Sequence, residues 1–308
     1  MHTGRVIAHA RPGNAFDLDP HSEPASQTAC SSPPPALSLP EAGARIHADV
    51  GRYRLRLAES AEDREAACRL RFRVFNIELG EGLESSYETG LDADHFDPVC
   101  EHLIVADKQS RRVVGTYRMQ SGATAARNQG YYSAREFNLA PYEPLRPGIL
   151  ELGRAAIDRE HRTSEVLMLL WRGIAEYATH MGLRYLLGCS SLNSNDPAEG
   201  WQLYGQLENF RVPAEFETTP TAAYACPVEQ RDADAPPLSC PRDRSLPGEG
   251  PSAVKVPKLL RTYLAIGARI AAAPAWDREF RSIDFLTLLD LQLLSPAARN
   301  RFLAPLGP

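Results

Sequence analysis

The stretch from residue 149 to residue 191 constrains the fold of this 308-residue chain more than any other part of it. An apolar strand, Ile149–Ile157, leads through a polar turn into a helical pattern at residues 165–181. A second apolar strand follows at residues 184–191, and Gly182 suits the position just after the helix end. A strand, a helix and a strand in this order form the βαβ unit typical of α/β proteins.

Alternating and i, i+4 apolar patterns predict the other elements. Those expected before the βαβ unit are a strand at Tyr53–Leu57, a helix running from the N-cap Ser60 to residue 79, and hairpin strands at 102–106 and 113–119. Those expected after it are helices at 197–210, 257–270 and 296–303, and strands near 222–225 and at 280–291.

Proline marks two irregular tracts. Residues 1–50 and 211–257 together hold 16 of the 25 prolines. We therefore expect a disordered Pro/Ser-rich tract at 1–50, followed by a single domain at 51–303 that a Pro-rich excursion interrupts at 211–252.

Composition and motifs exclude several classes of protein. The net charge is −5 and the basic residues are dispersed, which argues against nucleic-acid binding. No apolar run approaches the roughly 18 residues of a transmembrane helix, and no signal-like apolar core opens the chain, so we expect a cytoplasmic protein. The six cysteines lack C-x-x-C spacing and are expected to be reduced. Serine-hydrolase and dinucleotide-binding glycine motifs are absent.

The strand at Ile149–Ile157 carries both an acid, Glu151, and a base, Arg154. Charges inside an apolar strand are costly to bury and need partners. Internal ion pairs with Arg71 or Arg118 are one explanation and a functional site is the other. Three positions apart on a strand, the two side chains point to opposite faces unless a β-bulge intervenes.

A loop rich in acids, residues 80–98, precedes the predicted hairpin. Asp92, Asp94 and Asp97 have a spacing that would allow them to share a metal ion or a cationic substrate, although no glycine stands where an EF-hand loop requires one. Composition alone favours a solvated loop. His95 and His102 have no metal-ligand spacing and are interpreted as ordinary residues.

Two basic segments offer binding surfaces. Arg159, Arg162, Thr163 and Ser164 precede the helix of the βαβ unit, where free backbone N–H groups bind phosphate. The segment 255–269 has four basic and no acidic residues among apolar ones, which suits either an anionic lipid surface, an acidic partner or a docked surface helix.

Taken together, an ordered series of motifs resembles the GNAT-like acyltransferases that use acyl carrier protein. The shared motifs are Arg71-Phe72-Arg73-Val74-Phe75, Asp94-x-x-Asp97, residues 114–119 and Glu151-Leu152-Gly153-Arg154. Further motifs, at 131–137, 169–173, 188–192 and 196–197, are similar to the ornithine N-acyltransferase branch, often labelled hemolysin-like, rather than to its relatives, the acyl-homoserine-lactone synthases. The resemblance covers about residues 53–210 and 254–303.

This resemblance implies a mixed central sheet with splayed strands, flanked by helices in a single domain. The acyl-pantetheine arm would enter between the strands 149–157 and 184–190. The implied donor-binding residues are Ala156, Ile157, Arg159, Arg162, Thr163 and Ser164. The glycine-containing loop of acetyl-CoA users is missing here, which favours a carrier-protein donor. No cofactor besides the acyl-carrier co-substrate is implied, and no metal.

The implied reaction is transfer of a long-chain 3-hydroxyacyl group to the α-amino group of ornithine, the first step of ornithine lipid biosynthesis. Glu151 would act as the base and Tyr204 would protonate the leaving thiolate. The implied acceptor-binding residues are Arg71, Asp94, Asp97, Arg118 and Arg154.

Several alternatives remain at this stage. They are N-acylation of glycine or lysine, signal synthesis with S-adenosylmethionine as acceptor, and a lytic or adaptor protein at a membrane surface. Tyr204 is equally well explained as a packed core residue. A cytoplasmic enzyme with peripheral contact to anionic membrane through 255–269 agrees with the resemblance.

Overall fold

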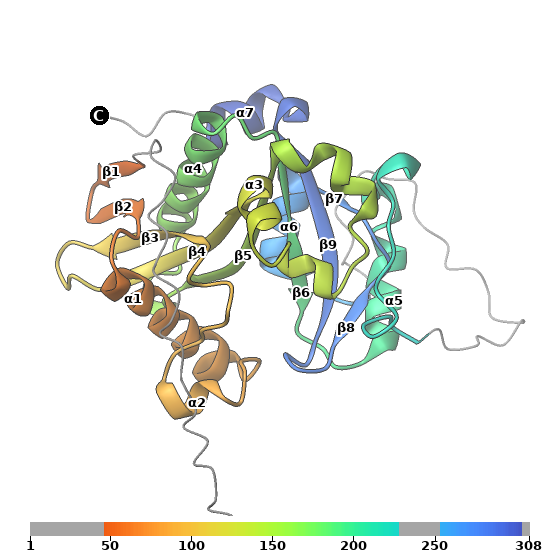
Figure 1. The fold of residues 1–308 in the computed structure, drawn as a ribbon, viewed down its shortest axis with the longest axis horizontal. Helices are drawn as coiled ribbons and strands as arrows, with labels where there is room; N and C mark the ends of the chain where they lie inside the picture. Colours follow the sequence, from red (N-terminus) through yellow and green to blue (C-terminus); the bar gives the residue numbers. More distant parts are fainter. Residues whose placement is uncertain (1–45, 228–252, 304–308) are drawn as a thin grey trace, which may run out of the picture. The chain divides into compact units, whose positions relative to one another are not determined.

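A computed structural model describes residues 46–227 and 253–303, all within one structural unit, Leu37–Pro308 (Figure 1). Most of the predicted N-terminal tract, up to residue 45, and residues 228–252 of the predicted excursion lie outside the described residues. Among the described helices, none is long and apolar enough to cross a bilayer.

A mixed sheet forms the centre of the described chain, with the strand order β1-β2-β3-β4-β5-β6-β9-β7 and β8 paired to β9. The strands are β1 (His47–Val50), β2 (Tyr53–Leu57), β3 (Glu101–Asp107), β4 (Val113–Ser121), β5 (Ile149–Ile157), β6 (Tyr185–Leu192), β7 (Arg269–Ile270), β8 (Ala275–Asp277) and β9 (Ser282–Asp290). In this sheet β5 and β6 run parallel and the other pairs run antiparallel. The predicted fold class is confirmed.

The first strand corrects one prediction. Residues up to 50 were expected to be irregular, whereas β1 pairs along its whole length with β2. Ile46 and Ala48 are buried in the core, whereas His47 and Asp49 are exposed. This alternation is short and follows a proline-rich tract, so the composition of the tract favoured an irregular segment over a strand.

The two faces of the sheet are covered differently (Figure 1). On one face lies α1 (Ala61–Phe72), continued by a π-helical turn at Arg73–Leu79. Its Leu70 and Val74 pack against Ile104 of β3 and Ala156 of β5. The N-cap Ser60 accepts a hydrogen bond from the backbone N–H of Asp63, as the sequence predicts.

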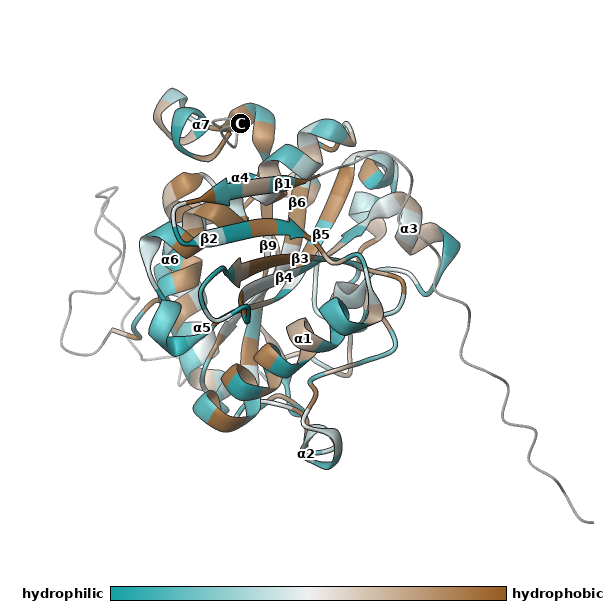
Figure 2. Ribbon diagram, turned by 90° about the vertical axis from the view of Figure 1, so that its left-hand side faces the viewer, coloured by the Kyte–Doolittle hydropathy of each residue, from teal (hydrophilic) through white to brown (hydrophobic). Residues whose placement is uncertain are grey.

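The other face is covered by α4 (Ser164–His180), the crossover helix of the βαβ unit. Its hydroxyl cap is Thr163, which accepts from the N–H of Val166, and Gly182 follows its end at a φ of 66°. Leu170 and Ile174 pack on Leu103 and the rest of the main core. Figure 2 shows the mainly hydrophobic β3 beside the mixed hydropathy of α1.

Three further helices lie on the face of α4: α5 (Pro197–Gln206), α6 (Lys258–Ile266) and α7 (Pro296–Phe302). The helix predicted at 257–270 ends early, because Gly267 adopts a φ of 113° and the chain then forms β7. The strand predicted near 222–225 is a turn, in which Ala225 alone forms a bridge to β8. Short helices α2 (Ser86–Thr89) and α3 (Gly122–Arg127) escaped prediction.

Candidate active site

A β-bulge in β5 lies where the strand carries its charged residues. The register with β4 shifts between Thr116 and Arg118, which leaves one extra residue on β5. Arg154 stands at this bulge with a φ of 51°, a conformation that costs free energy outside glycine. Both Glu151 and Arg154 line the same cavity. The bulge that they need in order to share a site is therefore present.

The cavity opens where β5 and β6 part. The two strands pair only from Ile149 to Glu151, and beyond these residues they diverge. At the point of divergence a side-chain Cβ on Gly188 would lie 2.2 Å from the carbonyl oxygen of Leu152, so only glycine fits there. The predicted splaying of these strands is confirmed. The resulting cavity has a volume of about 270 Å³.

The Glu151 carboxylate lies in the wall of this cavity and is 5% exposed. Its two oxygens accept hydrogen bonds from the backbone N–H groups of Tyr132, at 2.9 Å, and Ser133, at 2.8 Å. Burial raises the pKa of the Glu151 carboxyl, although these N–H groups oppose the shift. A fixed carboxylate with a raised pKa beside a cavity is suited to accept a proton.

Beside Glu151 lies a buried network of three aspartates and three arginines. Arg71 donates to Asp92 and to Asp97, each at 2.8 Å. Arg118 donates to Asp94 at 2.6 Å, and Arg154 lies 3.4 Å from the same carboxylate. The interpretation of Asp92, Asp94 and Asp97 as solvated is wrong, because tertiary pairing with the arginines takes these three acids out of water, whereas Glu84 and Glu88 of the same loop are exposed.

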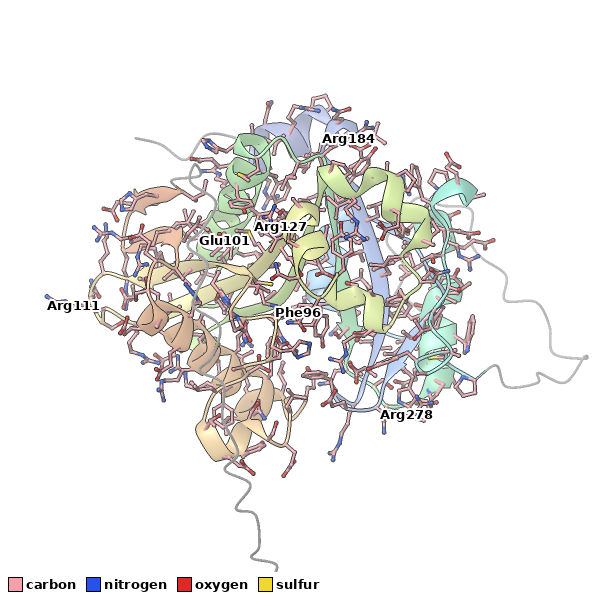
Figure 3. The ribbon with its side chains drawn as sticks, viewed as in Figure 1. Phe96, Glu101, Arg111, Arg127, Arg184 and Arg278 are labelled. Atoms are coloured by element: carbon pink, nitrogen blue, oxygen red, sulfur yellow. The ribbon has the colours of Figure 1, made fainter. Side chains whose placement is uncertain are left out.

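The arginines keep Asp94 and Asp97 charged. Burial opposes ionisation, but Arg71 holds the pKa of Asp97 below its usual range, and Arg118 does the same for Asp94. The Phe96 ring, labelled in Figure 3, lies 5.5 Å from the Arg118 guanidinium carbon. The network therefore has no net charge and is packed against aromatic rings.

The structure divides the residues predicted to bind the acceptor. Arg118 and Arg154 line the cavity, whereas Arg71, Asp94 and Asp97 lie outside its lining. Asp94 and Asp97 are already neutralised by arginines of the chain, so they are poorly placed to hold a second cation.

A second acidic cluster lies in the cavity wall and was not predicted. Glu136, Asp277 and Asp284 offer carboxylate oxygens within 4.8 Å of one another, and the three residues are 2%, 2% and 5% exposed. Burial raises the pKa of Glu136 well above its usual value and that of Asp284 to about 6. Unlike the first network, this cluster forms no ion pair with an arginine, lysine or histidine among the described residues.

Another acid, Glu81, stands where this cavity meets a larger groove of about 1180 Å³. Burial raises the pKa of Glu81 to about 7. The groove is lined on one side by the turn before α4. Of the predicted donor-binding residues, the groove is lined by Ile157, Arg162, Thr163 and Ser164.

Three of the predicted residues lie elsewhere. Ala156 is buried against α1, and Arg159 is exposed outside the groove lining. Tyr204 packs against Trp201, and the guanidinium carbon of Arg211 lies 4.0 Å from the centroid of the Tyr204 ring. It lines neither the cavity nor the groove. The prediction that Tyr204 protonates the thiolate has no support in this geometry, because α5 turns its side chain away.

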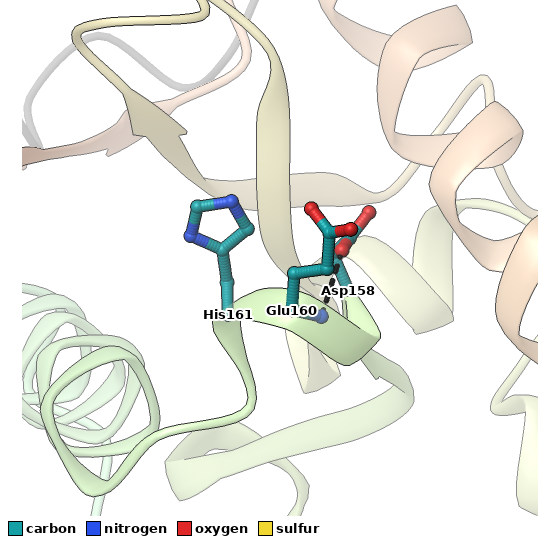
Figure 4. Close-up of side chains that lie close together, drawn as sticks. All are labelled: Asp158, Glu160 and His161. Carbon is teal, nitrogen blue, oxygen red and sulfur yellow. Dashed lines mark hydrogen bonds between the residues drawn. The ribbon is translucent and has the colours of Figure 1, made fainter.

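A further acidic group follows β5, formed by Asp158, Glu160 and His161 (Figure 4). Asp158 accepts from the Glu160 N–H at 3.1 Å and forms an ion pair with Arg112. A ring nitrogen of His161 lies 3.1 Å from the Tyr53 hydroxyl. Because Asp158 and His161 already have partners within the protein, these contacts stabilise the turn.

Comparisons with known proteins agree with this architecture. Residues 70–172 match the family model described as an acetyltransferase (GNAT) domain. The L-ornithine N(alpha)-acyltransferase of Brucella abortus is 30% identical over 87% of this chain and 97% of that protein. The enzyme of the same name from Rhizobium meliloti is 31% identical, over 84% of this chain and 86% of that protein.

Among solved structures, TofI in a ternary complex with an inhibitor and MTA aligns over 81% of this chain and 98% of its own, with 16% identity and a TM-score of 0.45. The CoA-dependent acyl-homoserine lactone synthase BjaI aligns over 77% and 79%, with 13% identity and a TM-score of 0.38. On the full-length sequence matches, the chain belongs to the L-ornithine N(alpha)-acyltransferase family.

Proposed function

We propose that this protein transfers a long-chain 3-hydroxyacyl group from acyl carrier protein to the α-amino group of ornithine. The observation that carries the proposal is the position of Glu151, in a small cavity that adjoins a long groove at the parting of β5 and β6. The cavity would hold the amino acid and the groove the acyl donor. The family to which the chain belongs supports ornithine as the acceptor.

The acceptor amine must lose a proton before it attacks, because an ammonium has no free electron pair. Glu151, directly or through one water, takes this proton; its raised pKa makes it a better base than an exposed carboxylate. The hydrogen bonds from Tyr132 and Ser133 fix its orientation and leave lone pairs on both oxygens.

The nitrogen then forms a bond to the thioester carbon, and the carbon–sulfur bond breaks. The nitrogen loses a second proton as the amide forms, so two protons leave it in all: one protonates the departing thiolate and the other passes from Glu151 to solvent. Leu152, Gly153 and Ala155 line the cavity where β5 has left β6. Peptide N–H groups there would stabilise the negative oxygen of the tetrahedral intermediate.

The groove suits a phosphopantetheine arm. Thr163 and Ser164 place hydroxyl groups and the N-terminus of α4 at one side of it. Arg162 is already paired with Glu78, at 2.6 and 2.9 Å, so it would contribute less than an unpaired cation. Lys255 and Lys258 line the groove as well. These groups would contact the phosphate and the acidic surface of a carrier protein.

An amphiphilic product implies a site close to a lipid surface. We propose a cytoplasmic enzyme that touches the inner membrane face through the basic residues of segment 255–269. In this segment Leu260 and Leu264 lie on the buried face of α6, whereas Lys258 and Arg261 of the same helix are exposed. Anionic lipid would attract such a surface.

The direct test is lipid mass spectrometry after expression in a host that lacks ornithine lipids, followed by assay of the purified protein. We expect an N-(3-hydroxyacyl)ornithine species in the host. The purified protein should form it from ornithine and 3-hydroxyacyl carrier protein, and more slowly from the matching acyl-CoA. Acylation of glycine in place of ornithine would redirect the assignment, and equal rates with both donors would remove the carrier protein from it.

A further inference from the structure

We propose that Glu136, Asp277 and Asp284 bind the side-chain ammonium of the acceptor amino acid and thereby select diamino acids with a side-chain amine. This inference rests on the proposed function, because it assigns the binding mode of the acceptor within the same cavity. None of the three residues belongs to the site predicted from the sequence.

The three carboxylates come from separate parts of the chain and meet at one point of the cavity wall. Glu136 follows a 3₁₀ turn at Tyr132–Arg135, Asp277 ends β8, and Asp284 lies in β9. Their oxygens lie within 4.8 Å of one another. An alkylammonium group carries three N–H donors on one nitrogen, which matches three acceptors gathered around one point.

The cluster lacks a counter-charge of its own. Asp277 accepts from the backbone N–H groups of Glu279 and Phe280. Asp284 is hydrogen-bonded to Ser191 and to Glu136 of the same cluster, and lies 3.5 Å from the Ser282 hydroxyl, so all its partners are uncharged groups or another carboxyl. Buried carboxylates are costly unless they are paired with a cation or take up protons. Within residues 46–227 and 253–303, no side chain supplies that cation, so the ligand of this cavity is left to supply it.

Unpartnered polar atoms give an independent sign of a missing ligand. One carboxylate oxygen of Glu136, the amide oxygen of Gln120 and the hydroxyl of Ser190 have no hydrogen-bond partner. All three residues line the cavity and are 6% exposed or less. Buried polar groups of native proteins are nearly always satisfied. A cavity left with free acceptors calls for a ligand rich in donors.

The opposite charge is available in the same cavity. Arg118 and Arg154 line it, and the charge of Arg154 is felt at Asp284. An amino acid with its α-carboxylate toward these arginines and its side chain toward the acidic cluster would leave its α-amino group toward Glu151. The arrangement is complementary to a dipolar acceptor with a second, distal cation.

A divalent metal ion is the competing occupant, since carboxylates ligate such ions. The ammonium accounts for more of the observations, because it matches the arginines across the cavity and the unpartnered acceptors of Gln120 and Ser190. The experiment therefore includes a measurement of the metal content of the purified protein.

The experiment compares ornithine with norvaline, which has the same carbon chain without the side-chain amine. kcat/KM is measured for both acceptors with the wild-type protein and with Glu136→Gln, Asp284→Asn and the double variant. The matched control is Glu279→Gln, which neutralises an exposed acid close in sequence to Asp277. We expect the wild type to prefer ornithine by about 100-fold, and the double variant to lose most of that preference through a higher KM for ornithine. Norvaline turnover should change much less than ornithine turnover, and the circular dichroism spectrum of each variant, compared with that of Glu279→Gln, reports that it is folded.

Each result points to a different conclusion. If the wild type acylates ornithine and norvaline equally well, the ammonium site is wrong while the proposed function survives. If it acylates neither, the proposed function itself fails. If the variants slow both acceptors by the same factor, the cluster has a structural role only. A stoichiometric divalent metal in the purified wild type that disappears in Asp284→Asn would assign the cluster to that metal.

Discussion

Two clusters of three buried carboxylates lie near the same cavity, and they differ in what balances their charge. Asp92, Asp94 and Asp97 are paired with Arg71, Arg118 and Arg154. The carboxylates of the second cluster have no such partners among the described residues. Because burying charge is costly in both places, the first cluster is complete as folded, while the second is completed by protons or by a bound cation.

The pKa values follow this division. Arginine lowers the pKa of Asp94 and Asp97 against the effect of burial, whereas burial without a cation raises the pKa of Glu136 and Asp284. The same residue type at similar depth therefore carries opposite shifts. This difference agrees with the proposal that the second cluster binds a cation from outside the chain.

The largest effect is expected from breaking the completed network. Arg71→Met leaves Asp92 and Asp97 buried without their closest cation, so we expect the free energy of unfolding to fall by about 3–5 kcal/mol. Urea unfolding followed by circular dichroism measures it. The control Arg69→Met removes an exposed arginine of the same helix, whose one ion pair among the described residues is with Glu65, and should cost about 0–1 kcal/mol. Similar losses in both variants would contradict the network's role.

The next largest effect concerns the base that stands between the two clusters. Glu151→Gln keeps the shape of the side chain but cannot accept a proton, so we expect kcat to fall by about 100-fold, with the thermal unfolding midpoint little changed. Steady-state kinetics on the purified protein give the value. Glu81→Gln is the informative companion, because Glu81 is a cavity acid with a raised pKa that belongs to neither cluster. A large loss in that variant with none in Glu151→Gln would move the base to Glu81.

The second cluster should behave in the opposite way to the first when a charge is removed. Asp284→Asn takes away an unpaired carboxylate, so the free protein should gain about 1–2 kcal/mol of unfolding free energy at pH 8. Below about pH 4 the carboxyl is protonated in both folded and unfolded states, and the gain should vanish. It should grow between pH 4 and about 6, the pKa of folded Asp284. Urea titrations of both proteins across this range measure the difference, and a loss of stability at pH 8 would show that Asp284 has a cation.

His102 gives the smallest effect, with the reverse pH dependence. Its ring is buried beside Asp97, and burial lowers its pKa from 6.5 to about 4. Between these values the unfolded state binds a proton that the folded state does not, so wild-type stability falls as the pH drops from 6.5 to 4. His102→Gln should remove about 1 kcal/mol of that decline. Urea titrations measure the free energy of unfolding of both proteins at each pH. If this free energy changed equally with pH in both, His102 would be protonated in the folded state.

Much of the fold follows from the sequence, because local patterns decide it. The βαβ unit, the caps of α1 and α4 and the long strand β9 agree with the predictions within a few residues. β1 and β8 are short, and they form strands only because β2 and β9 lie beside them.

The site divides in the same way. Glu151 and Arg154 stand out because charges interrupt an apolar strand, and the same rule applied to Asp284 in β9 would have found the second cluster. Glu136 and Asp277 lie in short elements without such a pattern, so only the fold brings them to Asp284. The position of Tyr204, outside the cavity and the groove, could not be read from the sequence either, because the rotation of a helix against a sheet is set by packing.

The most direct measurement is a crystal structure of the protein with ornithine bound. We expect the side-chain nitrogen to lie within about 2.7–3.2 Å of carboxylate oxygens of Glu136, Asp277 and Asp284. The α-carboxylate should face Arg154, and the α-amino group should face Glu151. A side-chain nitrogen bound at Asp94 or Asp97, or left in solvent, would contradict the account.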